Sequence, residues 1–242
     1  SRDEGTLTID HSNFTNDLKN YVVRTGDSNN PQFIEGVVFN AAEAVINNSY
    51  FENNSGTYGE AIATYAYKGG AAASLTVENC EFVNNLAYAG AGIYASDSTL
   101  IVKKSTFIGN NATGIGSYGY TSAGGAISFV GGVDANITDS RFINNTATVG
   151  GAVDVSGNRP VTLSVDACTF ENNTAVGSPK REAVGGAIRV NSKLSSDKLN
   201  VNVENSNFTN NVASVGGSAS YNNGTLELSG NKITGEGAGI YN

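Results

Sequence analysis

The chain has 242 residues, of which 22 are acidic and 14 basic, and its net charge is −8. An acidic chain without a Lys/Arg cluster binds nucleic acids and anionic membranes poorly, so we expect neither as a partner. No apolar run approaches the roughly 20 residues that span a bilayer, which argues against membrane insertion by this chain. The 30 glycines follow no collagen-like period and therefore indicate many turns.

Residues 1–45 contain the least regular copy of a repeat that is anchored by a phenylalanine, here Phe14. The stretch FNAAEAVI (39–46) fits a partly helical segment as well as strands. We therefore predict one domain, residues 1–242, with 1–45 as an atypical first coil and 46–242 as regular coils. Because the sequence stops within a repeat, we interpret it as part of a longer protein.

From residue 46 onward the repeat keeps the order L-x-V-x-x-S-x-F-x-x-N, followed by a glycine motif. Apolar residues before each anchor alternate with polar ones, as in a β-strand with one buried face. We predict an all-β fold, a single-stranded right-handed parallel β-helix of about eight coils, because parallel crossovers are almost always right-handed. The anchors that should stack from coil to coil are Phe51, Phe82, Phe107, Phe142, Phe170 and Phe208.

An asparagine follows each of these anchors by three residues, where a corner between strands is expected. Pointing inward, its amide can bond the asparagines of the coils above and below, which satisfies a buried polar group. The glycine motif lets the chain turn with positive φ and approach the neighbouring coil closely. The predicted ladder consists of Asn54, Asn85, Asn110, Asn145, Asn173 and Asn211.

Cys80 and Cys168 are the only cysteines, and each takes a place that serine holds in most other coils. They belong to coils three steps apart, roughly 14 Å at the strand spacing, which is too far for a disulfide. We interpret both as structural free thiols. The single histidine, His11, excludes any site that needs two histidines, and we predict no metal or cofactor site.

Two coils have longer connections between the anchor and the glycine motif than the others do. The extra residues lie in GIGSYGYTS (114–122) and SPKREAV (178–184), at the same corner with one short coil between them. We predict a shallow binding groove between these loops, because loops on a rigid scaffold commonly carry function. A solvated loop tip is the alternative explanation of the basic residues. The groove residues are Tyr118 and Tyr120 on one wall, Lys180, Arg181 and Glu182 on the other, and Thr146, Thr148 and Val149 on the floor.

The glycine motif reads GGA[I/V] at Gly124, Gly150 and Gly185 and is relaxed elsewhere, as in GGSA at Gly216. Together with the F-x-x-N anchors, it resembles the repeats of chlamydial polymorphic outer membrane proteins and of adhesin-like surface proteins of methanogenic archaea. The resemblance covers roughly residues 45 to 242. It implies a secreted, surface-anchored right-handed β-helix that is used in adhesion, and it supplies no catalytic residues.

We therefore expect an extracellular, monomeric, non-enzymatic adhesin-like module without a cofactor, whose partner is a glycan or a surface protein of a host or neighbouring cell. Two alternatives remain open. The chain could be a polysaccharide hydrolase, which needs the paired carboxylates that an interrupted outward row offers, or a lyase, which usually needs carboxylate-held Ca²⁺ and a basic group. The chain could instead be a passive spacer that holds another domain away from the cell wall. The acidic members of the row are Asp10, Glu78, Asp166 and Glu204.

Several N-x-[S/T] sequons occur along the chain. In a repeat rich in Asn and Thr most of them can arise from composition alone, yet some occupy the corner next to the ladder. Attachment of a glycan to these asparagines therefore stays open. The sequons begin at Asn13, Asn47, Asn53, Asn111, Asn136, Asn144, Asn172, Asn207 and Asn223.

Overall fold

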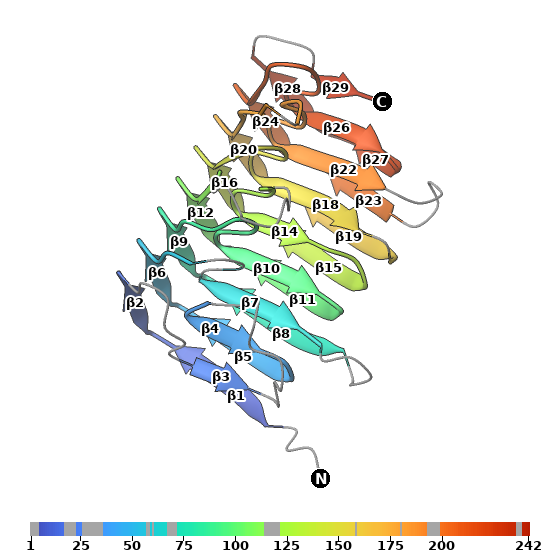
Figure 1. Cartoon of the computed structure of the whole chain (residues 1–242). Coiled ribbons are helices and arrows are strands. Elements are labelled where there is room, and N and C mark those ends of the chain that lie inside the picture. The colour runs from blue at the N-terminus through green and yellow to red at the C-terminus, as the bar shows by residue number, and fades with distance from the viewer. Residues whose placement is uncertain are drawn as a thin grey trace.

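The computed structural model describes residues 5–16, 23–25, 36–56, 59, 61–66, 72–113, 122–157, 159–179, 181–192, 199–235 and 239–242. Over these residues the chain contains strands and turns and no helix. It winds into coils that stack from the N-terminal to the C-terminal end, and neighbouring strands in each sheet are parallel (Figure 1). The predicted all-β parallel β-helix is confirmed.

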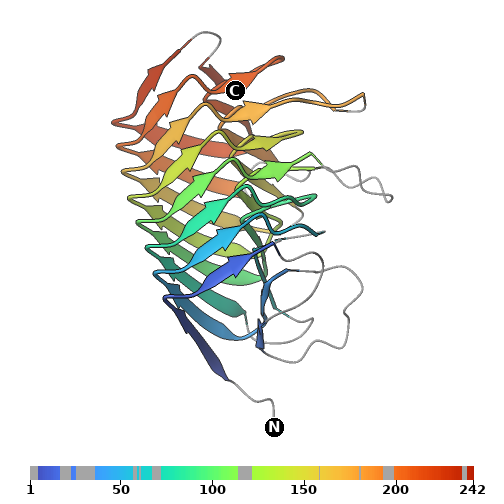
Figure 2. The same cartoon turned by 90° about the vertical axis from the view of Figure 1, so that its left-hand side faces the viewer.

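Four sheets form the sides of the helix, and Figure 2 shows their strands lying one above another from coil to coil. Sheet A consists of β1 (Thr6–Asp10), β5 (Glu43–Asn47), β8 (Ala73–Glu78), β11 (Ser98–Lys103), β15 (Val133–Thr138), β19 (Val161–Asp166), β23 (Leu199–Glu204) and β27 (Thr225–Ser229). Sheet B consists of β2 (Asn13–Thr15), β6 (Tyr50–Glu52), β9 (Glu81–Val83), β12 (Thr106–Ile108), β16 (Arg141–Ile143), β20 (Thr169–Glu171), β24 (Asn207–Thr209) and β28 (Lys232–Thr234).

The other two sheets complete each coil. Sheet C is short and consists of β13 (Asn111–Ala112), β17 (Thr146–Ala147), β21 (Thr174–Ala175) and β25 (Val212–Ala213). Sheet D consists of β3 (Val23–Thr25), β4 (Val38–Asn40), β7 (Ile62–Tyr65), β10 (Ile93–Ser96), β14 (Ile127–Phe129), β18 (Val153–Gly157), β22 (Ile188–Ser192), β26 (Ser220–Asn223) and β29 (Ile240–Tyr241). Sheets A and B each have eight strands, which agrees with the predicted number of coils.

The anchor phenylalanines, which belong to the strands of sheet B, stack in a single row inside the helix, as predicted. From Phe14 to Phe208, neighbouring ring centroids are 4.6–5.0 Å apart, and the rings lie nearly parallel. This separation is close to the strand spacing, because each ring rests on the ring of the next coil. The six anchors from Phe51 onward are at most 2% exposed. Their file is therefore the centre of the apolar core.

The predicted asparagine ladder is also confirmed. From Asn54 to Asn173, each Nδ2 donates to Oδ1 of the next asparagine at 2.9–3.0 Å. Each Nδ2, including that of Asn211, also donates to the carbonyl oxygen of the anchor in the preceding coil. The ladder therefore satisfies amides that are at most 4% exposed.

Each coil from β1–β2 onward has two corner residues with positive φ that the sequence analysis did not recognise. One lies three residues before the anchor and the other two residues after it. Asparagine and glycine adopt this conformation most easily, which explains why they dominate these variable positions. The first column is His11, Asn48, Asn79, Lys104, Asp139, Ala167, Asn205 and Gly230. The second column is Asn16, Asn53, Asn84, Gly109, Asn144, Asn172, Asn210 and Gly235.

The first glycine of the glycine motif also has positive φ, as predicted, but the motif of one coil is shifted. Gly217, with φ of 66°, takes this role, and so the placement of the motif at Gly216 was one residue too early. In the corrected register Ser220 pairs with Ile188 and stands in the inward column of Ile and Val. Its hydroxyl is buried, and among the described residues it has no hydrogen-bond partner. Because this position holds a polar residue in a column of apolar ones, the apolar pattern of the sequence did not reveal the correct register.

The expectation of a partly helical segment at residues 39–46 was wrong. Strands β4 and β5 cover most of it, because each finds a parallel partner in the next coil, β7 and β8 respectively. The first coil is atypical in another way. Strand β3 follows β2 in the chain but lies at the edge of sheet D beside β4, so two successive strands of the chain occupy the same sheet.

Both cysteines are free and 1% exposed, as predicted. Each replaces serine in a column where the hydroxyl of the next coil accepts a hydrogen bond from the backbone N–H, as Ser105 does from Cys80. Burial raises the pKa of the Cys80 thiol to about 11 and that of the Cys168 thiol to about 12. Both thiols are therefore protonated at neutral pH.

We expect neither thiol of the native protein to react with Ellman's reagent at pH 8, because the thiolate is the nucleophile. Both should react after unfolding in urea, and rapid reaction of the native protein would contradict their burial. Since the folded-state pKa exceeds the unfolded one, the stabilising contribution of the neutral thiols is complete below about pH 8.5. It is lost as the pH rises toward 11–12. Cys80→Ser, which restores the serine of other coils, should reduce this pH dependence.

Candidate functional site

The groove was predicted at the corner between sheets C and D. Tyr118, Tyr120 and Lys180 lie outside the described residues. Thr146 belongs to β17 and is half-buried, whereas Thr148 is 7% exposed. Val149 is 1% exposed and packs with Ala123 and Val184. Of the predicted floor, only Thr146 offers an appreciable part of its side chain to solvent.

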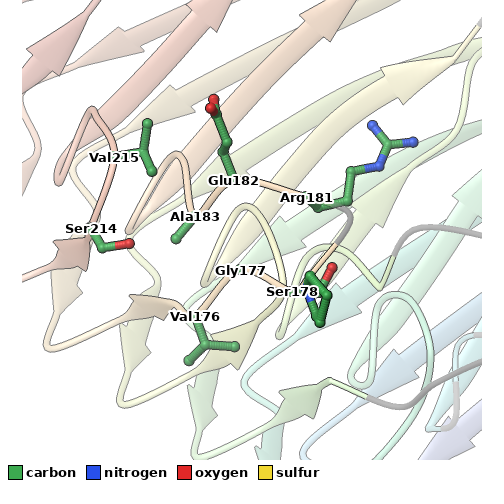
Figure 3. Close-up of a pocket in the computed structure, with 9 residues that line it drawn as sticks. Val176, Gly177, Ser178, Arg181, Glu182, Ala183, Ser214 and Val215 are labelled. Atoms are coloured by element: carbon green, nitrogen blue, oxygen red, sulfur yellow. The ribbon is translucent and has the colours of Figure 1, made fainter.

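A shallow hollow of about 500 Å³ lies beside the second long connection (Figure 3). The connection makes a tight turn, in which the Ser178 N–H donates to the Arg181 carbonyl at 2.8 Å and the Arg181 N–H donates back at 3.1 Å. The far side of the hollow comes from Ser214 and Val215 of the following coil. The hollow therefore lies between this connection, which includes Arg181, and the following coil.

The lining of the hollow combines apolar and charged side chains. Val176 and Val215 are 52% and 53% exposed. Arg181 and Glu182 are exposed, and within the described part of the chain neither forms an ion pair. In Figure 3 both side chains extend outward from the same connection. This surface has groups for both apolar and polar contacts with a ligand.

A buried ion pair lies under this corner, on the outward face of sheet D. The Arg189 Nε donates to Asp154 Oδ1 at 2.5 Å, and the Ser156 hydroxyl donates to Asp154 Oδ2 at 2.8 Å. Asp154 is fully buried and Arg189 is 4% exposed, because the turns of the glycine motif cover this face of the sheet. The sequence analysis missed the pair, although AVDV and AIRV place both residues at the same outward position of adjacent coils.

The outward acidic row has the predicted register, but it is not a cluster. Asp166 and Glu204 pair across adjacent coils of sheet A. Their carboxylates accept hydrogen bonds from Asn205 and Asn202, both at 2.9 Å. Among the described residues, no three His, Cys, Asp or Glu side chains lie close enough together to hold a metal ion.

Comparison with known proteins finds one distant similarity. Over 118 residues the chain is 36% identical to the metabotropic glutamate receptor-like protein R of Dictyostelium discoideum. The matched segment covers 48% of this chain and 6% of that protein. The chain thus spans a small part of this much longer relative. No family model matches the chain, and no solved structure matches it. In the described residues no helix is long and apolar enough to cross a membrane.

Proposed function

We propose that this chain is a β-helical recognition module of a cell-surface protein, which binds a glycan or a surface protein of a host or neighbouring cell. The observation that carries the proposal is the contrast between the regular stack and the corner of sheets C and D. The stack repeats similar side chains from coil to coil, whereas the long connection and the following coil place two exposed valines beside the exposed Arg181 and Glu182.

The scaffold suits recognition because the hollow rests on rigid elements. The file of phenylalanines and the asparagine ladder fix the height of each coil, and the buried Arg189–Asp154 pair lies beneath the corner. A ligand that covers Val176 and Val215 removes apolar surface from water, and Arg181 supplies donors for an anionic or polar group. Such preorganised surfaces lose little conformational entropy on binding.

The likeness to part of a receptor-like protein of Dictyostelium supports a location at the cell surface. So does the resemblance of the F-x-x-N and GGA[I/V] motifs to adhesin repeats. We accordingly propose that the module is extracellular, acts as a monomer and has no catalytic role.

A binding experiment tests the proposal. The purified chain should bind members of a glycan array or the surface of intact cells, and Val176→Asp or Val215→Asp should weaken binding at least tenfold. Burying one valine contributes about 1.5–3 kcal/mol, which corresponds to such a factor. Thr162→Asp adds the same charge at an exposed position of sheet A and should leave binding unchanged.

Two results would overturn the proposal. Absence of binding to any glycan or cell surface would favour a spacer, in which only the length of the stack matters. Release of reducing sugars from a polysaccharide panel, abolished by Asp166→Asn or Glu204→Gln, would establish the enzymatic alternative.

A further inference from the structure

Three of the sequons share one place in the fold. Asn53, Asn144 and Asn172 each lie two residues after an anchor, at the corner where sheet B ends. Their φ angles are 54°, 56° and 55°, and all three residues are exposed. They therefore form a row of chemically equivalent side chains along one edge of the helix.

The neighbouring asparagine is hydrogen-bonded in the core, whereas the side-chain amides of these three residues form no hydrogen bond within the described residues. In each pair of consecutive asparagines the second is a ladder residue, and its Nδ2 is bound inside the core, as for Asn145. The side chain of the first, Asn144, makes no hydrogen bond within the described residues. The other left-handed corner differs, because Asn48 and Asn79 each donate a hydrogen bond there at 2.7–2.8 Å.

The hydroxyl groups of the same sequons are likewise unused. Ser55, Thr146 and Thr174 occupy equivalent positions of sheet C and its N-terminal extension. Their hydroxyls form no hydrogen bond among the residues that the structure describes. Equivalent positions of two other coils hold Leu86 and Val212, so packing does not require a hydroxyl there. The positive φ of the corner accounts for the asparagine, whereas the stability of the coil does not account for the hydroxyl group of the motif.

We propose that Asn53, Asn144 and Asn172 are acceptors for N-linked glycans. The inference rests on the surface location in the proposed function, because the donor is a lipid-linked oligosaccharide pyrophosphate of a secretory route. The Asn Nδ2 forms a bond to C1 of the first sugar, and the C1–O bond to the pyrophosphate breaks. The lipid pyrophosphate leaves with the bonding electrons, and the amide loses one proton to a base of the transferase. No oxidation or reduction occurs.

The chain offers its own matched controls. Asn84 and Asn210 occupy the same corner, are exposed and have φ of 53° and 51°. They differ from the three proposed acceptors in that Leu86 and Val212 replace the sequon hydroxyl. Leu86→Thr and Val212→Thr complete a sequon in an identical local geometry. Conversely, Thr146→Val and Thr174→Val each destroy a sequon without changing its asparagine. Valine already occupies the equivalent position of a neighbouring coil, at Val212.

The experiment is site-resolved mass spectrometry of the chain secreted from eukaryotic cells behind a signal peptide, after release of glycans by peptide-N-glycosidase in ¹⁸O-labelled water. We expect label at Asn53, Asn144 and Asn172 and none at Asn84 or Asn210. Thr146→Val and Thr174→Val should each abolish label at their own asparagine while leaving the thermal unfolding of the deglycosylated protein unchanged. Leu86→Thr and Val212→Thr should add label at Asn84 and Asn210.

Absence of label at the three asparagines of the folded, secreted protein would overturn the inference. Failure of Leu86→Thr and Val212→Thr to create acceptors would also count against it, because the corner would then be inaccessible to the transferase. Binding of the deglycosylated chain to the glycan array and to intact cells is measured separately. If the three asparagines carry glycans but the chain binds no ligand, the recognition role is rejected and the glycosylation sites are supported. If the chain binds a ligand but the asparagines carry no glycan, the recognition role is supported and the glycosylation sites are rejected.

Discussion

Asn145→Ala should lower the free energy of unfolding by about 4 kcal/mol or more, because each buried polar group left without a partner costs about 1–3 kcal/mol. Asn145 is fully buried, and its side chain makes four hydrogen bonds. Its removal leaves the backbone N–H and Nδ2 of Asn110, the Phe107 carbonyl and the Asn173 amide oxygen short of a partner. Urea denaturation followed by circular dichroism measures the effect, since the chain has no tryptophan for fluorescence.

The neighbouring residue provides the control. Asn144→Ala changes an exposed side chain without hydrogen bonds and costs only the strain of alanine at positive φ, about 1–2 kcal/mol. Asn211→Ala should fall between the two, because among the described residues the Nδ2 of Asn211 donates to the Phe170 carbonyl alone. Equal losses for Asn144→Ala and Asn145→Ala would show that the ladder does not stabilise the stack.

Gly150→Ala is the second substitution with a large expected effect, a loss of about 3 kcal/mol in the free energy of unfolding. Gly150 has φ of 60°, and this conformation alone costs alanine about 1–2 kcal/mol. A Cβ on Gly150 would also lie 2.7 Å from the Val153 carbonyl oxygen and 3.2 Å from the Asp154 Cβ. The turn must therefore open, which disturbs the cover over the buried Asp154. Urea denaturation again measures the loss.

Two other glycines separate backbone strain from the clash. Gly109 has φ of 63°, and a Cβ there would meet only the flexible Asn84 side chain. Gly109→Asn introduces the residue that most other coils hold and should change the free energy of unfolding by less than about 1 kcal/mol. Gly216 has no positive φ, and the nearest atoms to a Cβ there belong to the exposed Tyr241 side chain, which can move, so Gly216→Ala should be nearly neutral. A similar cost at all three glycines would contradict the proposed cause.

The ladder and the glycine turn explain why the fold could be predicted well from the sequence. In a stack of coils each residue's neighbours above and below are its own equivalents in the adjacent repeats. The recurrence of Phe and Asn at fixed offsets therefore predicts which residues of adjacent coils contact each other. The Phe107–Phe142 stack and the Asn110–Asn145 hydrogen bond are two such contacts. Where an equivalent residue is replaced by one of different chemistry, as at Ser220, the prediction of the register failed.

The sequence by itself determined the class of fold, the residues of the core and the corner that carries unequal loops. The tertiary structure alone decided which residues that are not equivalent in the repeat come into contact. The Arg159–Asp97 ion pair skips a coil, and the hollow joins Val176 to Val215 of the next coil. The physical reason is that such contacts join residues that are not equivalent in the repeat. Their distance depends on the path of each connection, which the period of the repeat does not specify.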